Sequence, residues 1–254
     1  MSTTKCTDNL RSLLVDEVGA GAANCMLLSD ELYRVAQAKA IHELHSLYEE
    51  YTFASAKDAS LTDDLQRRIS NNKNRCDHEH TEDSLVYGEI DLQGFCDLLM
   101  NHVPHSHSDV FYDLGSGSGK AVFAARFLGD FQECVGIELL SNLHEMANSG
   151  VKSLYRFQYQ HKLVHQDVRF LCSDLLDYDG WWKDGTVVYI PNLLFSNKLK
   201  DQIAEKAVKM RPGTLLICLK KFEGAAFNFV FDLIKERPVA MSWGESITYI
   251  YKRQ

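Results

Sequence analysis

One stretch of the chain, residues 109–120, combines a strand pattern, an acid and three glycines. Its first half alternates apolar side chains and predicts a strand that ends at Asp113. Its second half has a glycine at every second position and leads into a helix-like pattern over residues 121–128. This order of elements lets the backbone approach a nucleotide-like ligand closely. The turn residues that we expect to bind the ligand are Asp113, Gly115, Ser116, Gly117, Gly119 and Lys120.

The spacing of these glycines distinguishes between ligands. A dinucleotide-binding turn has the pattern G-x-G-x-x-G, whereas this chain has G-x-G-x-G with Lys120 where the third glycine would fall. The pattern D-x-G-x-G-x-G resembles motif I of class I S-adenosylmethionine methyltransferases. That resemblance implies that Asp113 belongs to the network receiving the charged amino-acid end of the cofactor. The alternative is an ordinary glycine turn of an α/β protein, because a glycine motif alone does not identify a cofactor site.

Two more strand-like runs end in acids. Residues 134–138 end at Glu138, and a carboxylate at the end of the second strand of a βαβ unit accepts the ribose hydroxyls of a nucleoside. Residues 168–174 end at Asp174, next to Leu175, and by the same resemblance this acid faces the adenine amino group. The three acids together favour S-adenosylmethionine as the cofactor over three unrelated surface acids.

Composition sets the broad class. The chain has 254 residues, 45% of them hydrophobic, which is enough for one substantial α/β core. It has no apolar run of membrane-spanning length and no signal-peptide pattern at its start. Its seven cysteines are odd in number and include no C-x-x-C, which indicates reduced thiols in an intracellular compartment.

Charge is distributed unevenly along the chain. The formal net charge of −8 argues against a general nucleic-acid binder, yet the residues from 197 onward carry 11 Lys/Arg against 6 Asp/Glu. One interpretation is a solvated helix face, and the other is a surface that docks on an acidic partner. The second interpretation predicts contacts to DNA phosphates through Lys198, Lys200, Lys206 and Lys209.

The N-terminal third reads as a helical cap. A helix is predicted from Ser29 as its N-cap, and a second helix is predicted to begin at Thr62, with Leu65 and Ile69 facing inward. Residues 71–83 are polar and predict a flexible loop. We therefore expect residues 1–86 to form a helical cap with a flexible loop and residues 87–254 to form the catalytic domain.

The polar loop contains Cys76, His78 and His80, whose spacing could ligate zinc. No fourth ligand follows with finger-like spacing, and His102, His105 and His107 are not arranged as one. An exposed polar loop is therefore the favoured interpretation, and no metal site is expected.

Strands and helices alternate from residue 109 onward, which predicts a mostly parallel, doubly wound sheet. Helices are predicted over residues 139–158, 197–209 and 224–236, and a closing hairpin over 239–251 adds an antiparallel strand. The expected fold is the class I S-adenosylmethionine methyltransferase fold, a seven-stranded α/β sheet. A ligand lies outside the carboxyl ends of the strands in such sheets, which should bring Gly115–Gly119, Glu138, Asp174 and Asn192 around one cleft.

Four stretches, in this order, resemble one family. They are Val86–Glu89, Asp113–Lys120, Val187–Phe195 and Ser242–Tyr249. They are similar to the catalytic core of the "disruptor of telomeric silencing" family, the histone H3 lysine methyltransferases that lack a SET domain. The resemblance covers about residues 85–254, and the short chain is similar to compact protist members of that family.

This resemblance implies roles for further residues. Tyr87 and Glu89 would lie in a loop that folds over the cofactor, and Phe195, Trp243 and Tyr249 match aromatic positions of the lysine channel. The family's fourth-strand motif is Asn-Asn-Phe-x-Phe, and this chain has Pro191 in place of the first Asn and Leu193 in place of an aromatic residue. Asn192 is therefore the amide expected to contact the cofactor near its methyl group.

The implied function is methylation of a lysine in the globular core of histone H3 within nucleosomes, in the nucleus. A neutral lysine amine is the nucleophile, and an apolar aromatic channel favours the neutral form by desolvation. One alternative is a class I methyltransferase with another protein or a nucleic acid as substrate. The base-amine enzymes usually carry Asp/Asn-Pro-Pro-aromatic after the fourth strand, which this chain lacks. Another alternative is a non-catalytic binding module, because Pro191 departs from the motif.

Overall fold

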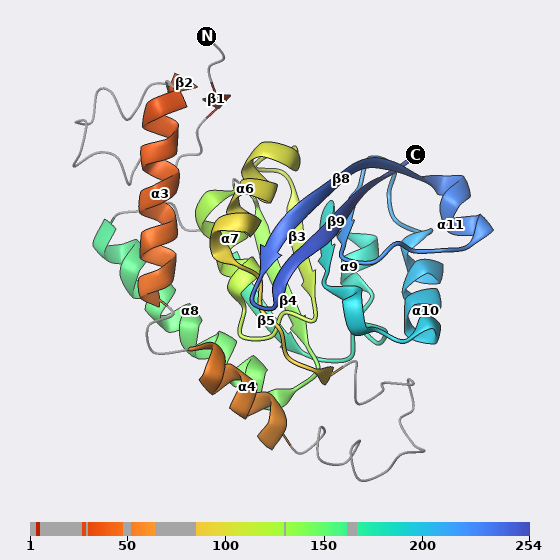
Figure 1. Cartoon of the computed structure of the whole chain (residues 1–254), viewed down its shortest axis with the longest axis horizontal. Helices are drawn as coiled ribbons and strands as arrows, with labels where there is room; N and C mark the ends of the chain where they lie inside the picture. Colours follow the sequence, from red (N-terminus) through yellow and green to blue (C-terminus); the bar gives the residue numbers. More distant parts are fainter. Residues whose placement is uncertain are drawn as a thin grey trace.

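The structure is a computed structural model that describes residues 4–5, 27–28, 30–47, 52–63, 85–129, 131–161 and 167–254. Its centre is a seven-stranded sheet with the strand order β5-β4-β3-β6-β7-β9-β8, flanked by helices (Figure 1). The strands of this sheet are β3 (Val110–Leu114), β4 (Glu133–Glu138), β5 (Asp167–Cys172), β6 (Val187–Ile190), β7 (Leu215–Cys218), β8 (Phe231–Met241) and β9 (Gly244–Arg253). A separate two-stranded sheet pairs β1 (Thr4–Lys5) with β2 (Leu27–Leu28).

The first five strands of the large sheet run parallel, and only the last two are antiparallel to their neighbours. Parallel strands need crossover connections, which the helices supply. The crossover helices are α7 (Lys120–Leu128), α8 (Ser141–His161), α9 (Gly180–Lys183) and α10 (Asn197–Ala207). Helix α6 (Leu92–His102) precedes β3, and α11 (Ala225–Val230) lies between β7 and β8. This strand order confirms the predicted doubly wound α/β fold. Within the described residues, no helix is both long and apolar enough to cross a bilayer.

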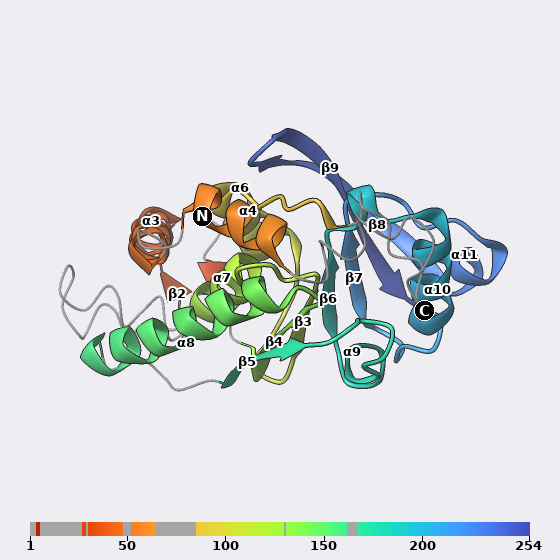
Figure 2. The same ribbon diagram turned by 90° about the horizontal axis from the view of Figure 1, so that it is seen from below.

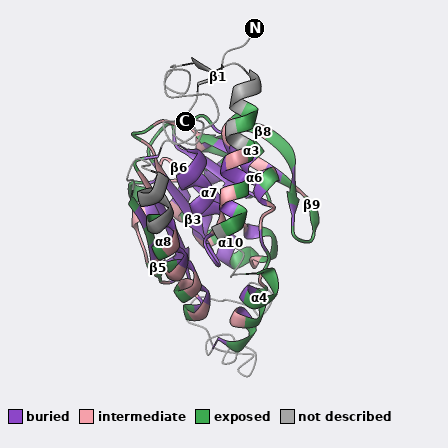
Figure 3. Cartoon of the chain, turned by 90° about the vertical axis from the view of Figure 1, so that its left-hand side faces the viewer, coloured by how far each residue is buried: buried purple, intermediate pink, exposed green. Residues whose placement is uncertain are grey.

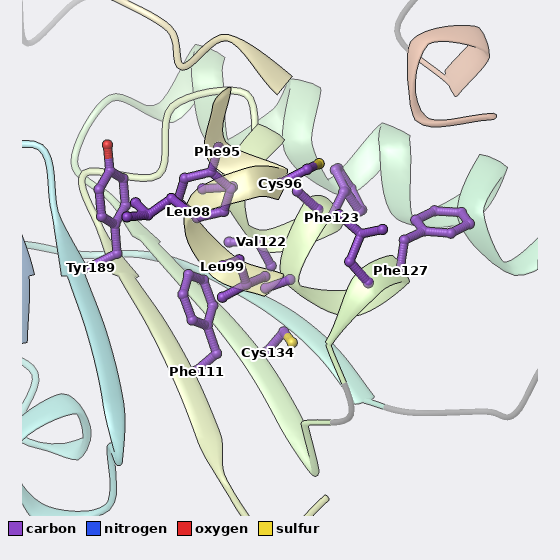
Figure 4. Packing of buried hydrophobic residues seen from close by; sticks show 14 of the residues in the cluster. Phe95, Cys96, Leu98, Leu99, Phe111, Val122, Phe123, Phe127, Cys134 and Tyr189 are labelled. Carbon is purple, nitrogen blue, oxygen red and sulfur yellow. The ribbon is translucent and has the colours of Figure 1, made fainter. Parts of the chain in front are cut away.

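The alternation predicted for the central strand separates two packing faces. Phe111 of β3 packs with α6 and α7 on one face, together with Cys134 of β4 (Figure 4). Tyr112 and Leu114 face the other cluster, which includes residues of α9, α10 and α11. Figure 2 shows α7 and α8 on one side of the strands and α9 and α10 on the other. Both faces are therefore covered, as a parallel sheet requires.

Two N-terminal helices pack on the sheet domain. Helix α3 (Asp30–Leu47) contacts α6 and α7, with Ala40 and Leu44 buried in the same cluster as Phe111. Helix α4 (Phe53–Thr62) lies against α8 and buries Ala56 (Figure 1). Most of α4 remains exposed, as do large parts of β8 and β9, whereas β3, β4, β6 and β7 are buried (Figure 3).

The buried Asp63, at the end of α4, holds the start of α8. Its carboxylate accepts hydrogen bonds from the Ser141 hydroxyl (2.9 Å) and the Asn142 backbone N–H (3.0 Å). The first N–H groups of a helix have no partner within the helix, so a carboxylate from another segment stabilises them and the positive end of the helix dipole. Because α8 begins directly after Glu138, this contact also fixes the loop beside that acid.

Helix α4 ends at Thr62, the residue at which the second N-terminal helix is predicted to begin. The residues that the predicted helix would occupy after Asp63 lie outside the described residues. Leu65, Ile69, the polar loop 71–83 and the candidate zinc ligands Cys76, His78 and His80 lie outside the described residues. The helix predicted over 224–236 is wrong beyond Val230, where β8 begins; the β-branched and apolar residues from Phe231 onward pair with β9.

Replacing Asp63 with Ala should destabilise the fold by about 1 kcal/mol, since it removes the carboxylate that caps α8. The matched control is Asp58→Ala, an exposed acid on the same helix α4. Urea denaturation followed by circular dichroism would measure both free energies of unfolding. Equal stabilities of the two variants would contradict the capping role of Asp63.

Candidate active site

A cavity of about 590 Å³ opens at the carboxyl ends of β3, β4 and β6. This is the edge of a parallel sheet where ligands bind. Most of the residues predicted to bind a cofactor line it. Those residues are Tyr87, Glu89, Asp113, Gly115, Ser116, Gly117, Lys120, Glu138 and Leu175, and Phe195 and Trp243 line it as well.

The glycine turn between β3 and α7 has the geometry that its sequence predicts. Gly115, Gly117 and Gly119 have φ values of 92°, 53° and 92°, a region that favours glycine. A Cβ atom on Gly117 would lie 2.7 Å from the ring of Tyr87, so a side chain here would displace that ring. Gly119 begins α7 and lies against Phe170, outside the cavity lining.

Glu138 is held by two backbone donors. One carboxylate oxygen accepts the N–H of Gly117 (2.7 Å) and the other accepts the N–H of Leu140 (2.8 Å). Burial raises the pKa of Glu138, while hydrogen bonds from the Leu140 and Gly117 backbone act in the opposite direction. The end of β4 and the glycine turn are therefore joined through this one side chain.

Asp113 is buried at the end of the neighbouring strand. Burial raises the pKa of its carboxyl well above the ordinary value, and the Glu138 carboxylate adds to this rise. Among the described residues, its Oδ1 atom has no hydrogen-bond partner. A buried carboxylate oxygen facing a cavity without a partner is suited to receive a cationic or hydrogen-bond-donating group of a ligand.

The segment from Leu85 to Asp91 forms one wall of the cavity and is held by Glu89. The Glu89 carboxylate accepts the Tyr87 hydroxyl (2.5 Å) and pairs with the Lys120 ammonium. The Tyr87 hydroxyl also donates to or accepts from Ser118 of the glycine turn (3.0 Å). Glu89 is only 5% exposed, so these contacts form in a poorly solvated environment and link the segment directly to the turn.

The same segment is also bound to the turn of the C-terminal hairpin. The backbone N–H of Glu89 donates to the Ser242 hydroxyl (3.1 Å), and the Glu89 carbonyl accepts the Ser242 N–H (2.9 Å). Trp243 lies against Gly88, where a Cβ atom would come within 2.3 Å of the indole. A side chain at position 88 would therefore displace the Trp243 indole.

Several apolar residues line the opening of the cavity near β6. Pro191, Leu193, Leu194 and Phe195 follow the end of β6 and all line the cavity. Leu193 and Leu194 are exposed, and Phe195 is partly exposed. With Trp243 on the opposite wall, this group offers an apolar, partly aromatic entrance to a second reactant.

Besides Gly119, three predicted site residues lie outside the cavity lining. Asn192 is 0% exposed, and its amide accepts from the N–H groups of Leu219 and Lys220 and donates to the Lys220 carbonyl. Its side chain therefore joins the ends of β6 and β7, and its contact with the cofactor stays a prediction. Asp174 accepts the Leu176 N–H (2.8 Å), while its neighbours Ser173 and Leu175 line the cavity.

Tyr249 is the third of these residues. Its ring packs with the cluster on the α10 face, and the Lys221 ammonium lies 4.9 Å from the ring centre. Tyr249 therefore lies outside the cavity lining, and its place in a lysine channel stays a prediction.

The four lysines predicted to contact DNA do not form one surface. Lys200 is only 8% exposed, because it lies on the face of α10 turned toward the sheet, and burial lowers its pKa. Lys206 and Lys209 lie within 6 Å of the Trp182 ring (5.9 and 5.6 Å) near the far end of α10. Lys198 is exposed in the first turn of α10, directly after the cavity-lining residues.

Sequence reasoning missed several residues of the lining. Phe53 and Lys57 come from α4, and Phe53 stacks on Tyr87 with ring centres 6.0 Å apart. No local pattern signals this contact, because α4 is far from the glycine turn in sequence. Ser118 lies within the recognised turn, and Tyr189 lies on β6; their polarity beside the motif residues was an available signal.

The cavity fits the cofactor that the sequence predicts. Gly117 leaves room that a side chain would fill, and Asp113 presents an unpartnered oxygen within the described part of the chain. Glu138 stands at the end of the second strand, where a ribose-binding acid is expected. No group of three or more His, Cys, Asp or Glu side chains in the described segments is arranged to hold a metal ion.

The strand order, with an antiparallel last strand inserted beside β7, and the glycine turn after the central strand define the class I methyltransferase fold. A model of the family described as "Histone methylation protein DOT1" matches residues 65–242. The chain belongs to this family. The matched range includes the glycine turn, Tyr87, Glu89 and the apolar residues after β6, whereas Phe53, Lys57 and Trp243 of the cavity lining fall outside it.

Curated relatives carry the name "Histone-lysine N-methyltransferase, H3 lysine-79 specific". The protein from Candida albicans is 30% identical over 177 residues, which cover 62% of this chain and 12% of that protein. The protein from Eremothecium gossypii is 25% identical, covering 59% of this chain and 26% of its own length. The Drosophila melanogaster protein is 27% identical, covering 54% and 8%. This chain thus spans about a quarter or less of the relatives it matches.

Solved structures overlap with the chain in part. The B. subtilis tRNA methyltransferase TrmK is 14% identical with a TM-score of 0.46, covering 65% of this chain and 66% of its own. TrmN from Thermus thermophilus is 16% identical with a TM-score of 0.46, covering 63% and 48%. The fold is assigned from the strand order of this chain alone.

Replacing Glu89 with Gln should weaken binding of S-adenosylhomocysteine, because the amide cannot pair with Lys120 while accepting the Tyr87 hydroxyl. The expected loss is roughly 1–3 kcal/mol of binding free energy, the usual cost of breaking a buried charge-assisted contact. Glu245→Gln, which changes an exposed acid on the neighbouring hairpin, is the control. Titration calorimetry that gave one dissociation constant for wild type and both variants would refute a role of Glu89 in closing the cavity.

Proposed function

We propose that the chain is an S-adenosylmethionine-dependent lysine N-methyltransferase that acts on histone H3. Membership of the histone methylation family supports the activity, and the names of the relatives support the substrate. The observation that carries the proposal is the cavity itself. It combines the acids and glycines of a cofactor site at its base with an apolar opening beside the end of β6.

The residues at the base suit the parts of the cofactor. Asp113 would receive the amino-acid end, Glu138 would accept ribose hydroxyls, and Leu175 would pack on adenine. Tyr87 and Glu89 would close over it from the opposite wall. Asp174 stands beside Leu175 but is turned to its own backbone, so adenine recognition in this proposal relies on Ser173 and Leu175.

The residues at the opening suit a lysine side chain. S-adenosylmethionine, when bound, supplies a methyl group on a sulfonium, and the protein mainly positions the two reactants in line. The apolar Leu193, Leu194 and Phe195 would desolvate the lysine amine and so favour its neutral, nucleophilic form. Trp243 would cover the lysine stem from the hairpin side, where a contact with a cation is also favourable.

Methyl transfer from tritiated S-adenosylmethionine onto nucleosomes, free histones and RNA in parallel tests the proposal. Label should appear on histone H3 and be lost in the Gly117→Arg variant, whose side chain would occupy the cavity. Label on RNA, or on a different histone, would favour a class I methyltransferase with another substrate. Cofactor binding without transfer to any of these would favour a non-catalytic module.

We further propose that the substrate is the nucleosome surface in the nucleus and that Lys198 contacts DNA phosphates. Lys198 is exposed beside the apolar opening, whereas Lys206 and Lys209 lie toward the opposite edge of the sheet, because α10 leads from the end of β6 back to the start of β7. Lys206 is also paired with Asp179 at 3.3 Å, which reduces its charge toward a partner. Lys200 is excluded from such contacts by its burial.

Neutralising Lys198 should reduce the salt dependence of nucleosome binding, because each phosphate contact releases counterions. The slope of log affinity against log salt should fall in magnitude by about 1 for Lys198→Gln. Lys206→Gln, at the far end of the same helix, should change the slope less. Fluorescence anisotropy across a salt series would measure both slopes. Equal slopes for wild type and Lys198→Gln would overturn this contact.

A further inference from the structure

Tyr189 on β6 carries a buried hydroxyl that the described chain leaves without a hydrogen bond. The residue is 1% exposed and lines the cavity. Its ring packs edge-on against Phe95 of α6, with ring centres 5.2 Å apart. Figure 4 shows this ring beside Phe95 and Leu98, with the hydroxyl oxygen at the edge of the apolar cluster.

Packing alone does not account for this hydroxyl. A phenylalanine would fill the same space against Phe95 without placing a polar group where water is excluded. A buried hydroxyl without a partner costs free energy, so its presence in a cavity wall indicates a partner that enters the cavity.

Tyr189 stands directly beside Asp113. The two residues are partners in the parallel pairing of β3 with β6, so their side chains leave the sheet on the same face. Both line the cavity, and neither the Tyr189 hydroxyl nor Asp113 Oδ1 has a hydrogen-bond partner in the part of the chain described. They therefore do not bond to each other, and a ligand group placed between them would satisfy both.

The hydrogen-bonding properties of Asp113 and Tyr189 indicate which chemical group of a ligand they can bind. Asp113 is an acceptor when ionised, and a phenol hydroxyl both donates and accepts. An ammonium with an adjacent carboxylate, as at the end of an amino acid, offers donors to Asp113 and an acceptor or donor to Tyr189. Adenine and ribose carry no cationic group for Asp113.

We propose that the Tyr189 hydroxyl and the Asp113 carboxylate together receive the charged amino-acid end of the cofactor, an inference that rests on the proposed S-adenosylmethionine dependence. The amide expected from the fourth strand does not face the cavity, since Pro191 replaces one asparagine and Asn192 bonds to β7. Tyr189 supplies a polar group from β6 itself, two residues before Pro191. It is a binding residue for the cofactor.

The test compares two ligands that differ only in this end. S-adenosylhomocysteine has the amino-acid end, and 5′-methylthioadenosine lacks it. Tyr189→Phe should weaken S-adenosylhomocysteine roughly 10-fold, the effect of losing a hydrogen bond to a charged group, and leave methylthioadenosine unchanged. Tyr251→Phe is the control, because it removes a hydroxyl from another buried tyrosine of the same sheet, outside the cavity.

Two further measurements separate binding from folding. The melting temperature of ligand-free Tyr189→Phe should equal or exceed that of wild type, because the variant buries no unpartnered hydroxyl. In the Asp113→Asn background, Tyr189→Phe should cause a smaller additional loss of S-adenosylhomocysteine affinity, since both side chains would hold one group.

Two outcomes would overturn the inference while wild type still binds both ligands. They are unchanged affinity of Tyr189→Phe for S-adenosylhomocysteine and an equal loss of affinity for both ligands. Unchanged affinity with reduced methyl transfer would place the hydroxyl on the lysine side of the cavity. If wild type binds neither ligand, the cofactor proposal itself fails, and that result is distinct from the other two.

Discussion

The arrangement of this protein depends on two carboxylates, Asp113 and Glu138, buried side by side at the ends of neighbouring strands. Burial raises the pKa of both acids, and the Glu138 carboxylate raises the pKa of Asp113 further. The glycine turn offsets part of this cost, because its backbone reaches Glu138 with an N–H that a bulkier chain could not bring so close. Among the described residues, no donor bonds to Asp113 Oδ1 in this way. This buried oxygen therefore lacks a hydrogen bond until a ligand enters the cavity.

Three segments that are distant in sequence complete the cavity around these acids. Helix α4 contributes Phe53, residues 85–91 contribute the Glu89 network, and the turn after β8 contributes Ser242 and Trp243. These segments are joined to one another, because Phe53 stacks on Tyr87 and Ser242 forms two hydrogen bonds with the Glu89 backbone. The Ser242 hydroxyl accepts the Glu89 N–H, and the Ser242 N–H donates to the Glu89 carbonyl. This wall of the cavity is thus a small assembly whose parts support each other, so a substitution in one part should alter the packing of the others.

Local patterns predicted the sheet and the base of the site, and long-range contacts account for what they missed. The alternation around Asp113 and the acid after residues 134–137 are properties of single strands, so they could be recognised in sequence. Asn192 follows a strand in the same way, yet its amide bonds to the residues after β7. The direction of this side chain is set by a neighbouring strand and is not visible in the local sequence. Lys200 lies in a basic run but on the inner face of its helix. The strand from Phe231 was mistaken for helix because its pairing with β9 overrides its local preference.

Asp63 gives the N-terminal helices a thermodynamic connection to whatever fills the cavity. Its carboxylate holds the start of α8, and the same helix α4 places Phe53 and Lys57 on the cavity wall. A ligand that touches this wall binds more tightly when α4 is docked, and by reciprocity it must favour the docked helix to the same extent. The abundance of the ligand would then be reported by α4, as resistance of this helix to proteases. In this way the contact between Asp63 and α8 makes the docking of α4 depend on whether a ligand occupies the cavity.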